Sequence, residues 1–175
     1  YQKVDYLALN GDYEAAYREL EELMPYEMKN TQAYDDLLLL RSDLNSALGN
    51  WDLTVSDLLT LCENCRDYNA IRYSNLLTRL SYAYLQMAEY DKAVNCVSER
   101  FELNRDIIDD KFYTFSTMER SAISASTAIT NPIDVYSLLS FSRKPKVLKL
   151  VYDAAIYYKG LQLRTENHVR RSILT

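Results

Sequence analysis

Apolar residues in the segment 145–164 recur at the spacing of one helix face. They are Val147, Val151, Ala154, Tyr158 and Leu161. With the boundary signals along the rest of the chain, this patterning predicts a run of helices. The predicted helices cover 1–9, 12–24, 32–47, 51–65, 70–87, 90–103, 108–129, 132–142 and 145–164, with a tail or another helix from 166.

Three stretches of the chain share a four-position pattern. A small residue is followed two positions later by an aromatic one, then three later by another small one and four later by an apolar one. The three copies are spaced 38 and then 39 residues apart, which indicates stacked copies of one helical unit. The members are Gly11, Tyr13, Ala16 and Leu20; Gly49, Trp51, Thr54 and Leu58; and Ala88, Tyr90, Ala93 and Val97.

Each position of the pattern has a physical role in a pair of helices. The first small residue allows a tight turn, and an acid beside it, such as Asp12, favours the N-terminus of the next helix. The aromatic residue is expected to pack back on the preceding helix, which places Tyr13 and Tyr90 in the core. The second small residue lets two helices approach closely, and the apolar residue one turn later continues the buried stripe.

A fourth unit departs from this pattern. One period beyond the third copy lies Thr127, and Ile129 stands where an aromatic residue is expected. Pro132 replaces the second small residue, and after Asn131 it suits the first position of a helix. The repeat therefore ends or is distorted here. In the last helix, Gly160 predicts a bend or a cap.

Composition supports helices and excludes other classes. With 3 Gly and 3 Pro, the chain lacks the turns that a sandwich or barrel needs every ~8–12 residues. A net charge of −5 gives no general reason to bind nucleic acid, which favours basic domains. No apolar run reaches the roughly 18 residues of a membrane span. We therefore expect one all-α domain over 1–175 without a membrane span and without a nucleic-acid partner.

Charge is distributed unevenly along the sequence. Residues 1–36 carry nine acids and three bases, whereas residues 142–175 carry eight bases and two acids. One interpretation is a pair of solvated helix faces. The other is a docking end for an acidic neighbour.

The repeated pattern resembles that of the tetratricopeptide repeat. The resemblance covers about residues 1–104, and residues 105–175 hold a divergent repeat and terminal helices. The family period is about 34 residues. The resemblance implies helix hairpins stacked in a right-handed superhelix, whose concave face, lined by the first helix of each pair, binds peptides. Carried onto this sequence, the peptide-binding positions are Asp36, Leu39, Asp43, Ser46, Asn75, Thr78, Tyr82 and Gln86. A polar exposed face without a ligand is the competing interpretation.

A second resemblance lies near the C-terminus. The segment Leu150-Val151-Tyr152-Asp153-Ala154-Ala155-Ile156-Tyr157-Tyr158-Lys159-Gly160-Leu161-Gln162-Leu163-Arg164 is similar to the helix at the end of the repeats in CHAT proteins, which are caspase-like proteases fused to tetratricopeptide repeats. In that family the helix leads into the protease domain. Ile156 stands where that pattern has Leu. The resemblance implies a repeat region in front of a protease domain in cis, so we expect the gene to continue past Thr175 and to encode a His followed by a Cys.

Residues that carry chemistry are few. The histidine His168 is followed by no cysteine, so the His–Cys pair of that protease class is absent, and a surface position is expected. Cys62, Cys65 and Cys96 are expected to be buried small hydrophobes, because a zinc site usually needs four ligands. No metal, no cofactor and no catalysis are therefore predicted.

The sequence favours a non-catalytic scaffold that binds a protein or peptide, as the regulatory repeat region of a CHAT-type protease. The alternative is a helical-repeat lipoprotein of a cell-envelope system that binds a glycan or a peptide, with Trp51 and tyrosines as stacking platforms. Acids such as Asp36 and Asp43 suggest a ligand with basic character. The odd number of cysteines favours a reducing, cytoplasmic location, although a start at Tyr1 leaves open a removed signal or anchor.

Overall fold

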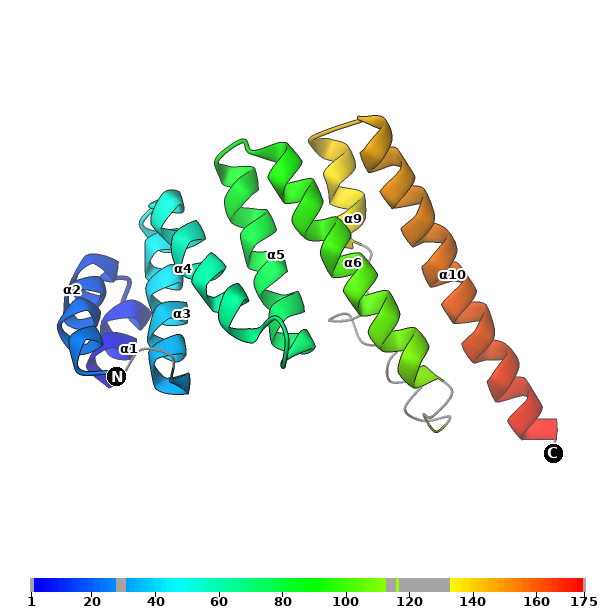
Figure 1. Ribbon diagram of the computed structural model, residues 1–175, viewed down its shortest axis with the longest axis horizontal. Coiled ribbons are helices and arrows are strands. Elements are labelled where there is room, and N and C mark those ends of the chain that lie inside the picture. Colours follow the sequence, from blue (N-terminus) through cyan, green and yellow to red (C-terminus); the bar gives the residue numbers. More distant parts are fainter. Residues whose placement is uncertain (1, 28–30, 113–115, 117–132, 175) are drawn as a thin grey trace. The chain divides into compact units, whose positions relative to one another are not determined.

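The computed structural model describes residues 2–27, 31–112, 116 and 133–174. Throughout this part of the chain the regular elements are helices (Figure 1), which confirms the all-α class. The chain divides into two compact units, Tyr1–Ala93 and Val94–Thr175.

The first unit is a succession of short helices that pack on their neighbours in the sequence. The pairs in contact are α1 with α2, α2 with α3, α3 with α4, and α4 with α5. Their bounds are α1 Gln2–Leu9, α2 Tyr13–Leu23, a 3₁₀ turn Met24–Tyr26, α3 Gln32–Ala47, α4 Trp51–Cys65 and α5 Ala70–Gln86. These helices confirm the predicted ones to within one or two residues at each end.

The first small residue of each repeat sits in a left-handed turn. Gly11, Gly49 and Ala88 have φ angles of 80°, 77° and 57°. Glycine adopts this conformation without steric cost, and the turn stops one helix and reverses the chain into the next. The following helix α2 is capped by Asp12, whose side chain accepts a hydrogen bond from the backbone N–H of Ala15 at 3.2 Å.

The other repeat positions divide into confirmed and wrong predictions. The second small residues Ala16, Thr54 and Ala93 are buried, with at most 4% of their surface exposed, as close helix packing requires. The apolar residues of the pattern, Leu20, Leu58 and Val97, are buried as well. The aromatic position was wrongly placed in the core: Tyr13 and Tyr90 are 38% and 41% exposed. Each begins its helix, where one side of the ring faces solvent.

Arg41 of α3 ties three helices of the first unit together. Its Nε and Nη2 donate to the two carboxylate oxygens of Asp57 on α4, at 2.9 and 2.6 Å. Its Nη1 donates to Glu21 on α2 at 3.1 Å. The hydrogen bonds from Arg41 to buried Asp57 raise the pKa of Arg41 above its ordinary value, so the guanidinium stays charged. Two parallel N–H···O bonds of this kind fix the register of α3 on α4.

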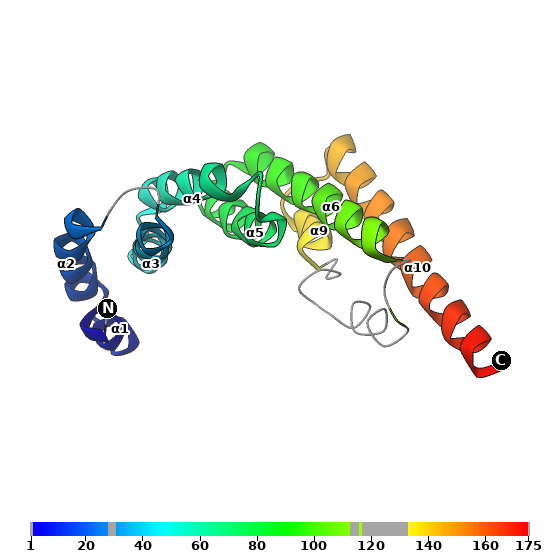
Figure 2. The ribbon, with the colours of Figure 1, turned by 60° about the horizontal axis from the view of Figure 1, so that its bottom comes forward.

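The second unit is built from two long helices and a short helical segment. Most of α6 (Tyr90–Phe112) belongs to it, followed by α9 (Ile133–Ser137), a 3₁₀ turn Leu138–Ser140 and α10 (Pro145–Leu174). Figures 1 and 2 both show α10 running beside α6. Their core consists of Val94, Val97, Phe101, Val135, Leu138, Val147, Leu150 and Ala154. Three members of the stripe predicted for α10 are buried: Val147, Ala154 and Leu161.

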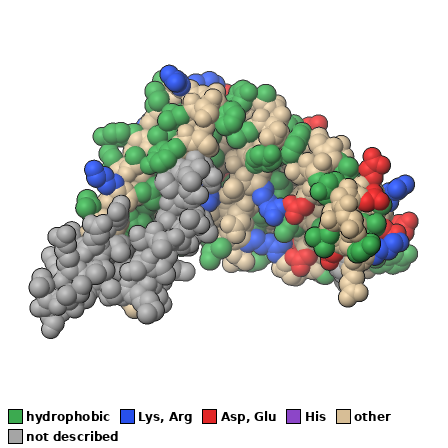
Figure 3. Space-filling view, turned by 180° about the vertical axis from the view of Figure 1, so that it is seen from behind, with side chains coloured by type: hydrophobic (Ala, Val, Ile, Leu, Met, Phe, Trp, Pro, Cys, Tyr) green, Lys and Arg blue, Asp and Glu red, His purple; other side chains and the backbone are tan. Residues whose placement is uncertain are grey.

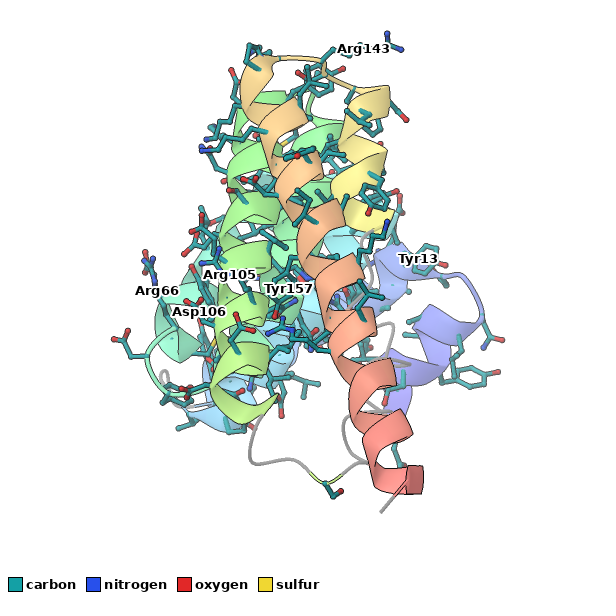
Figure 4. The ribbon with its side chains drawn as sticks, turned by 90° about the vertical axis from the view of Figure 1, so that its right-hand side faces the viewer. Tyr13, Arg66, Arg105, Asp106, Arg143 and Tyr157 are labelled. Carbon is teal, nitrogen blue, oxygen red and sulfur yellow. The ribbon has the colours of Figure 1, made fainter. Side chains whose placement is uncertain are left out.

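Tyr157 joins α10 to α6 inside this unit. Figure 4 shows its side chain directed toward α6 beside Arg105. The hydroxyl donates to the carboxylate of Asp109 at 3.2 Å and lies 3.3 Å from the backbone oxygen of Arg105. The ring meets Phe101 edge-on, with centroids 5.9 Å apart. Burial and the nearby Asp109 raise the pKa of Tyr157.

Four predictions in the second unit are corrected. The helix predicted over 90–103 continues to Phe112, because no Gly or Pro interrupts it, so a new helix does not begin at 108. The rest of the predicted 108–129 helix lies outside the described residues except Ser116, which is not helical. The 132–142 helix is shorter, and Pro132 lies outside the described part. Gly160 neither bends nor caps α10, which runs unbroken from Pro145 to Leu174.

Candidate functional site

A pocket opens on the first unit between α3, α4 and α5, with a volume of about 340 Å³. Its floor consists of buried residues: Ser42, Thr54, Leu58 and Ala83. Its rim consists of more exposed residues: Asp43, Ser46, Trp51, Thr78, Arg79 and Tyr82. This volume is in the range of small-ligand sites, and it accommodates one or two amino-acid side chains.

Hydroxyl groups inside the pocket are turned toward the backbone. Ser42 donates to the carbonyl of Leu39 at 2.7 Å, Thr54 to that of Asn50 at 3.1 Å, and Thr78 to that of Ser74 at 3.3 Å. These bonds satisfy the buried oxygens within their own helices. The pocket therefore presents mainly carbon and aromatic surface, which favours an apolar ligand group.

Two aromatic rings form one wall of the pocket. Trp51, at the start of α4, and Tyr82, on α5, meet edge to face with centroids 5.8 Å apart and ring planes at 75°. Tyr82 remains 54% exposed. Within the described part of the chain, neither the Trp51 indole N–H nor the Ser46 hydroxyl has a hydrogen-bond partner. Both groups are thus available to donate to a carbonyl of a ligand.

Ion pairs join α3 to α5 along the same face. Asp43 pairs with Arg79, and about two helical turns earlier Asp36 lies 3.7 Å from Nη2 of Arg72. Buried Asp35 lies 3.9 Å from the same nitrogen and accepts a hydrogen bond from Asn64 at 2.7 Å. The acidic side chains of this face are therefore largely balanced by arginines. This removes the reason to expect a basic ligand.

The structure brings half of the predicted peptide-binding residues together. Asp43 and Ser46 of α3 and Thr78 and Tyr82 of α5 line the pocket. The other four lie on the same two helices but do not line it: Asp36, Leu39, Asn75 and Gln86. Asp36 accepts a hydrogen bond from Gln32 at 2.7 Å. The role of all eight residues in binding stays a prediction.

Sequence reasoning missed two residues of the pocket wall. Trp51 was assigned to the packing position of the repeat and, in the glycan alternative, to a stacking platform, but not to the peptide site, and Arg79 was not considered. A signal for the arginine is present in the sequence, because Arg72 and Arg79 each follow an aspartate, Asp36 and Asp43, by 36 residues. That spacing is close to the repeat period, so it places the two charges on adjacent first helices.

A smaller cavity of about 200 Å³ lies near the N-terminus of α3. It is lined by Thr31, Gln32, Asp35, Asn64 and Tyr68. The Asp35 carboxylate already accepts from Asn64 there, and Thr31 caps the helix by accepting from the Tyr34 N–H at 3.2 Å. Its polar groups therefore serve the protein itself, and we regard the larger pocket as the candidate site.

The cysteines are buried, as predicted. Cys62, Cys65 and Cys96 are at most 9% exposed. Burial and the nearby Glu99 raise the pKa of Cys96 to about 11, and burial raises that of Cys65. In the described residues no cluster of three His, Cys, Asp or Glu side chains is placed to hold a metal ion. Among the helices of those residues, none is long and apolar enough to cross a membrane.

Comparison with known proteins gives no match, whether with family models, curated proteins or solved structures. The function of the pocket therefore has to be inferred from its own geometry.

Proposed function

We propose that this chain is a non-catalytic, tetratricopeptide-like scaffold that binds an extended peptide across α3 and α5. The observation that carries this proposal is the pocket walled by Trp51 and Tyr82. An apolar or aromatic side chain of the peptide enters this pocket. The peptide backbone accepts hydrogen bonds at the rim, where the Trp51 N–H and the Ser46 hydroxyl are available.

Aromatic rings at a pocket rim suit this role energetically. Tyrosine and tryptophan dominate binding free energy at protein interfaces because each contributes a large rigid contact area with a polar tip. The Asp43–Arg79 pair beside the pocket offers one carboxylate and one guanidinium to the flanking residues of the peptide. A ligand that carries both charges, or neither, fits this face better than a strongly basic one.

The experiment is a selection from a random displayed-peptide library followed by affinity measurement. Tyr82→Ala is expected to weaken a selected peptide roughly tenfold or more, since an aromatic anchor is lost. Tyr26→Ala is the matched control, because Tyr26 is an 86% exposed tyrosine of the same unit outside the pocket. Equal affinities of the two variants would contradict the proposal.

The protease context is a proposal that rests on resemblance. The motif from Tyr152 to Leu163 lies in the middle of α10, with Leu161 buried and Tyr152 66% exposed. From that segment we infer that this chain is a regulatory repeat region in cis with a CHAT-type protease domain. Sequencing of the locus tests it: the prediction is a downstream His followed by a Cys.

A glycan is the second candidate ligand, favoured by the Trp51–Tyr82 pair, since sugar rings stack on aromatic side chains. Titration with an oligosaccharide panel, in parallel with the selected peptide, separates the two. Saturable binding of a glycan that Tyr82→Ala abolishes would favour the glycan. The peptide proposal expects saturation by peptide alone.

A further inference from the structure

Exposed apolar side chains form a ridge along α10. Leu148, Tyr152 and Ile156 are 49%, 66% and 54% exposed, and their spacing of four residues places them on one side of the helix. Leu163, at 50% exposed, continues the ridge two turns later. The buried residues Val147, Leu150 and Ala154 face the core instead. A continuous apolar ridge of this kind marks an interaction surface.

Basic side chains flank this ridge. Lys149 and Lys159 are exposed, and in the described part of the chain neither has an ion-pair partner. Arg143 projects just before the helix begins (Figure 4). Asp153 is the single acidic residue of the stretch 142–161. The ridge therefore presents apolar surface inside a positive field, and it suits a partner surface that is apolar and acidic.

The first hairpin of the chain carries a surface of that chemistry. Tyr6 and Leu9 of α1 are 67% and 87% exposed, and Tyr13 of α2 is 38% exposed. Asp5 and Glu14 adjoin these residues and have no ion-pair partner within the described residues. Figure 3 shows acidic side chains, with some basic ones among them, beside hydrophobic side chains on these helices.

We propose that the basic ridge of α10 docks on the acidic first hairpin, α1 and α2, of a second copy of this chain. The net charges of the stretch that holds α1 and α2, 2–23, and of α10, 145–174, are −4 and +4, equal and opposite. Contact between two α10 ridges, or between two first hairpins, brings like charges together, so the head-to-tail arrangement is favoured. Such a contact is heterologous and repeats from copy to copy. This inference does not depend on the peptide pocket.

Sedimentation velocity of the whole chain over a range of concentrations tests the proposal. At about 50 mM salt the mean mass is expected to rise with concentration. At about 1 M salt, where the screening length falls to about 3 Å, the association constant is expected to fall by tenfold or more. A chain that remains monomeric at low salt and high concentration overturns the proposal.

Charge-reversal variants identify the surfaces. Two double variants are each expected to abolish association. One is Lys149→Glu with Lys159→Glu on the ridge, and the other is Asp5→Lys with Glu14→Lys on the first hairpin. An equimolar mixture of the two variants is expected to restore it, because each altered surface then meets its complement. Glu63→Lys with Asp67→Lys, two exposed acids elsewhere in the first unit, is the control with the same charge change and is expected to show less effect.

Other outcomes contradict the head-to-tail arrangement. If the chain associates and Asp5→Lys with Glu14→Lys has no more effect than its control, α10 binds another surface. If the mixture fails to restore association while each variant keeps its helical circular dichroism, the two surfaces are not partners. Should the lysine variant unfold, Asp5→Asn with Glu14→Gln tests the same surface, with a smaller expected loss.

Discussion

The first unit consists of helices of 8 to 17 residues, whereas α6 and α10 are 23 and 30 residues long. In the first unit each hairpin reverses at a glycine in a left-handed turn, at Gly11 or Gly49. In the second, Gly160 lies inside a helix and interrupts nothing. The comparison shows that turn geometry, rather than glycine itself, sets the length of these helices.

Both units have a buried apolar core, and they differ in the contacts that supplement it. In the first, Arg41 bridges α2, α3 and α4 with charged hydrogen bonds. In the second, the rings of Phe101, Tyr157 and Tyr158 are in mutual edge contact. Substitutions at a buried small residue, at ion pairs and at glycines measure how much each kind of contact contributes to stability.

The largest effect is expected at Ala93, which is fully buried at the repeat's second small position. Ala93→Glu places a charge and a long side chain there and is expected to cost about 3 kcal/mol or more in free energy of unfolding. Glu102→Ala, at an exposed position of the same helix, is the control, with a change near zero. Urea denaturation of both variants measures the difference. Equal midpoints would show that the repeat register is wrong.

The next largest effect is expected at the ion pair of the first unit. Asp57→Ala leaves Arg41, which is three-quarters buried, without its main partner, and we expect a loss of about 2 kcal/mol. Lys3→Met breaks the exposed pair with Glu19 and is expected to change stability by less than about 0.5 kcal/mol. Thermal unfolding of both variants compares them, and a larger loss for Lys3→Met contradicts the account.

Replacement of a glycine by alanine is expected to change the free energy of unfolding in opposite directions in the two units. Gly49→Ala forces a Cβ into a left-handed turn and is expected to destabilise by about 1 kcal/mol. Gly160→Ala adds a helix-favouring residue where, apart from the adjacent helix backbone, no atom of the described residues lies within 4 Å of the new Cβ, and it is expected to stabilise by about 0.5–1 kcal/mol. Denaturation midpoints that shift in the same direction would contradict the turn argument.

At neutral pH the smallest effect is expected from the buried thiols, which act on stability only in alkaline solution. The folded state holds the Cys96 proton up to about pH 11, against an ordinary pKa of 9.0. The unfolded state loses this proton first. Ionisation of Cys96 therefore leaves the free energy of unfolding unchanged below about pH 9 and lowers it as pH rises toward 11. Cys96→Ala is expected to reduce that slope in urea titrations across pH 8–11. An unchanged slope would show that the thiol is accessible.

The first unit was more predictable from the sequence than the second. The boundaries of α3, α4 and α5 could be predicted from the turn residues Gly49 and Ala88, because a left-handed turn depends on the local sequence. The end of α6 at Phe112 was missed since no local breaker marks it. The exposure of Tyr13 was missed because a helix's first residue is half solvated even when its pattern suggests packing.

The candidate site was predictable only in part, for a related reason. Helix periodicity placed Asp43 and Tyr82 on one face of their helices, and both line the pocket. The aromatic contact of Trp51 and the pairing of Arg79 with Asp43 depend on how α3, α4 and α5 pack. A pattern within one helix carries no information on such contacts.

The central claim is that the pocket walled by Trp51 and Tyr82 receives a peptide side chain. Trp51 is the single tryptophan of the chain, so its fluorescence reports on this pocket alone. Titration with a selected peptide is expected to shift the emission of Trp51 to shorter wavelength and to saturate at the Kd measured by calorimetry. Calorimetric binding that leaves the emission of Trp51 unchanged would show that the peptide binds elsewhere.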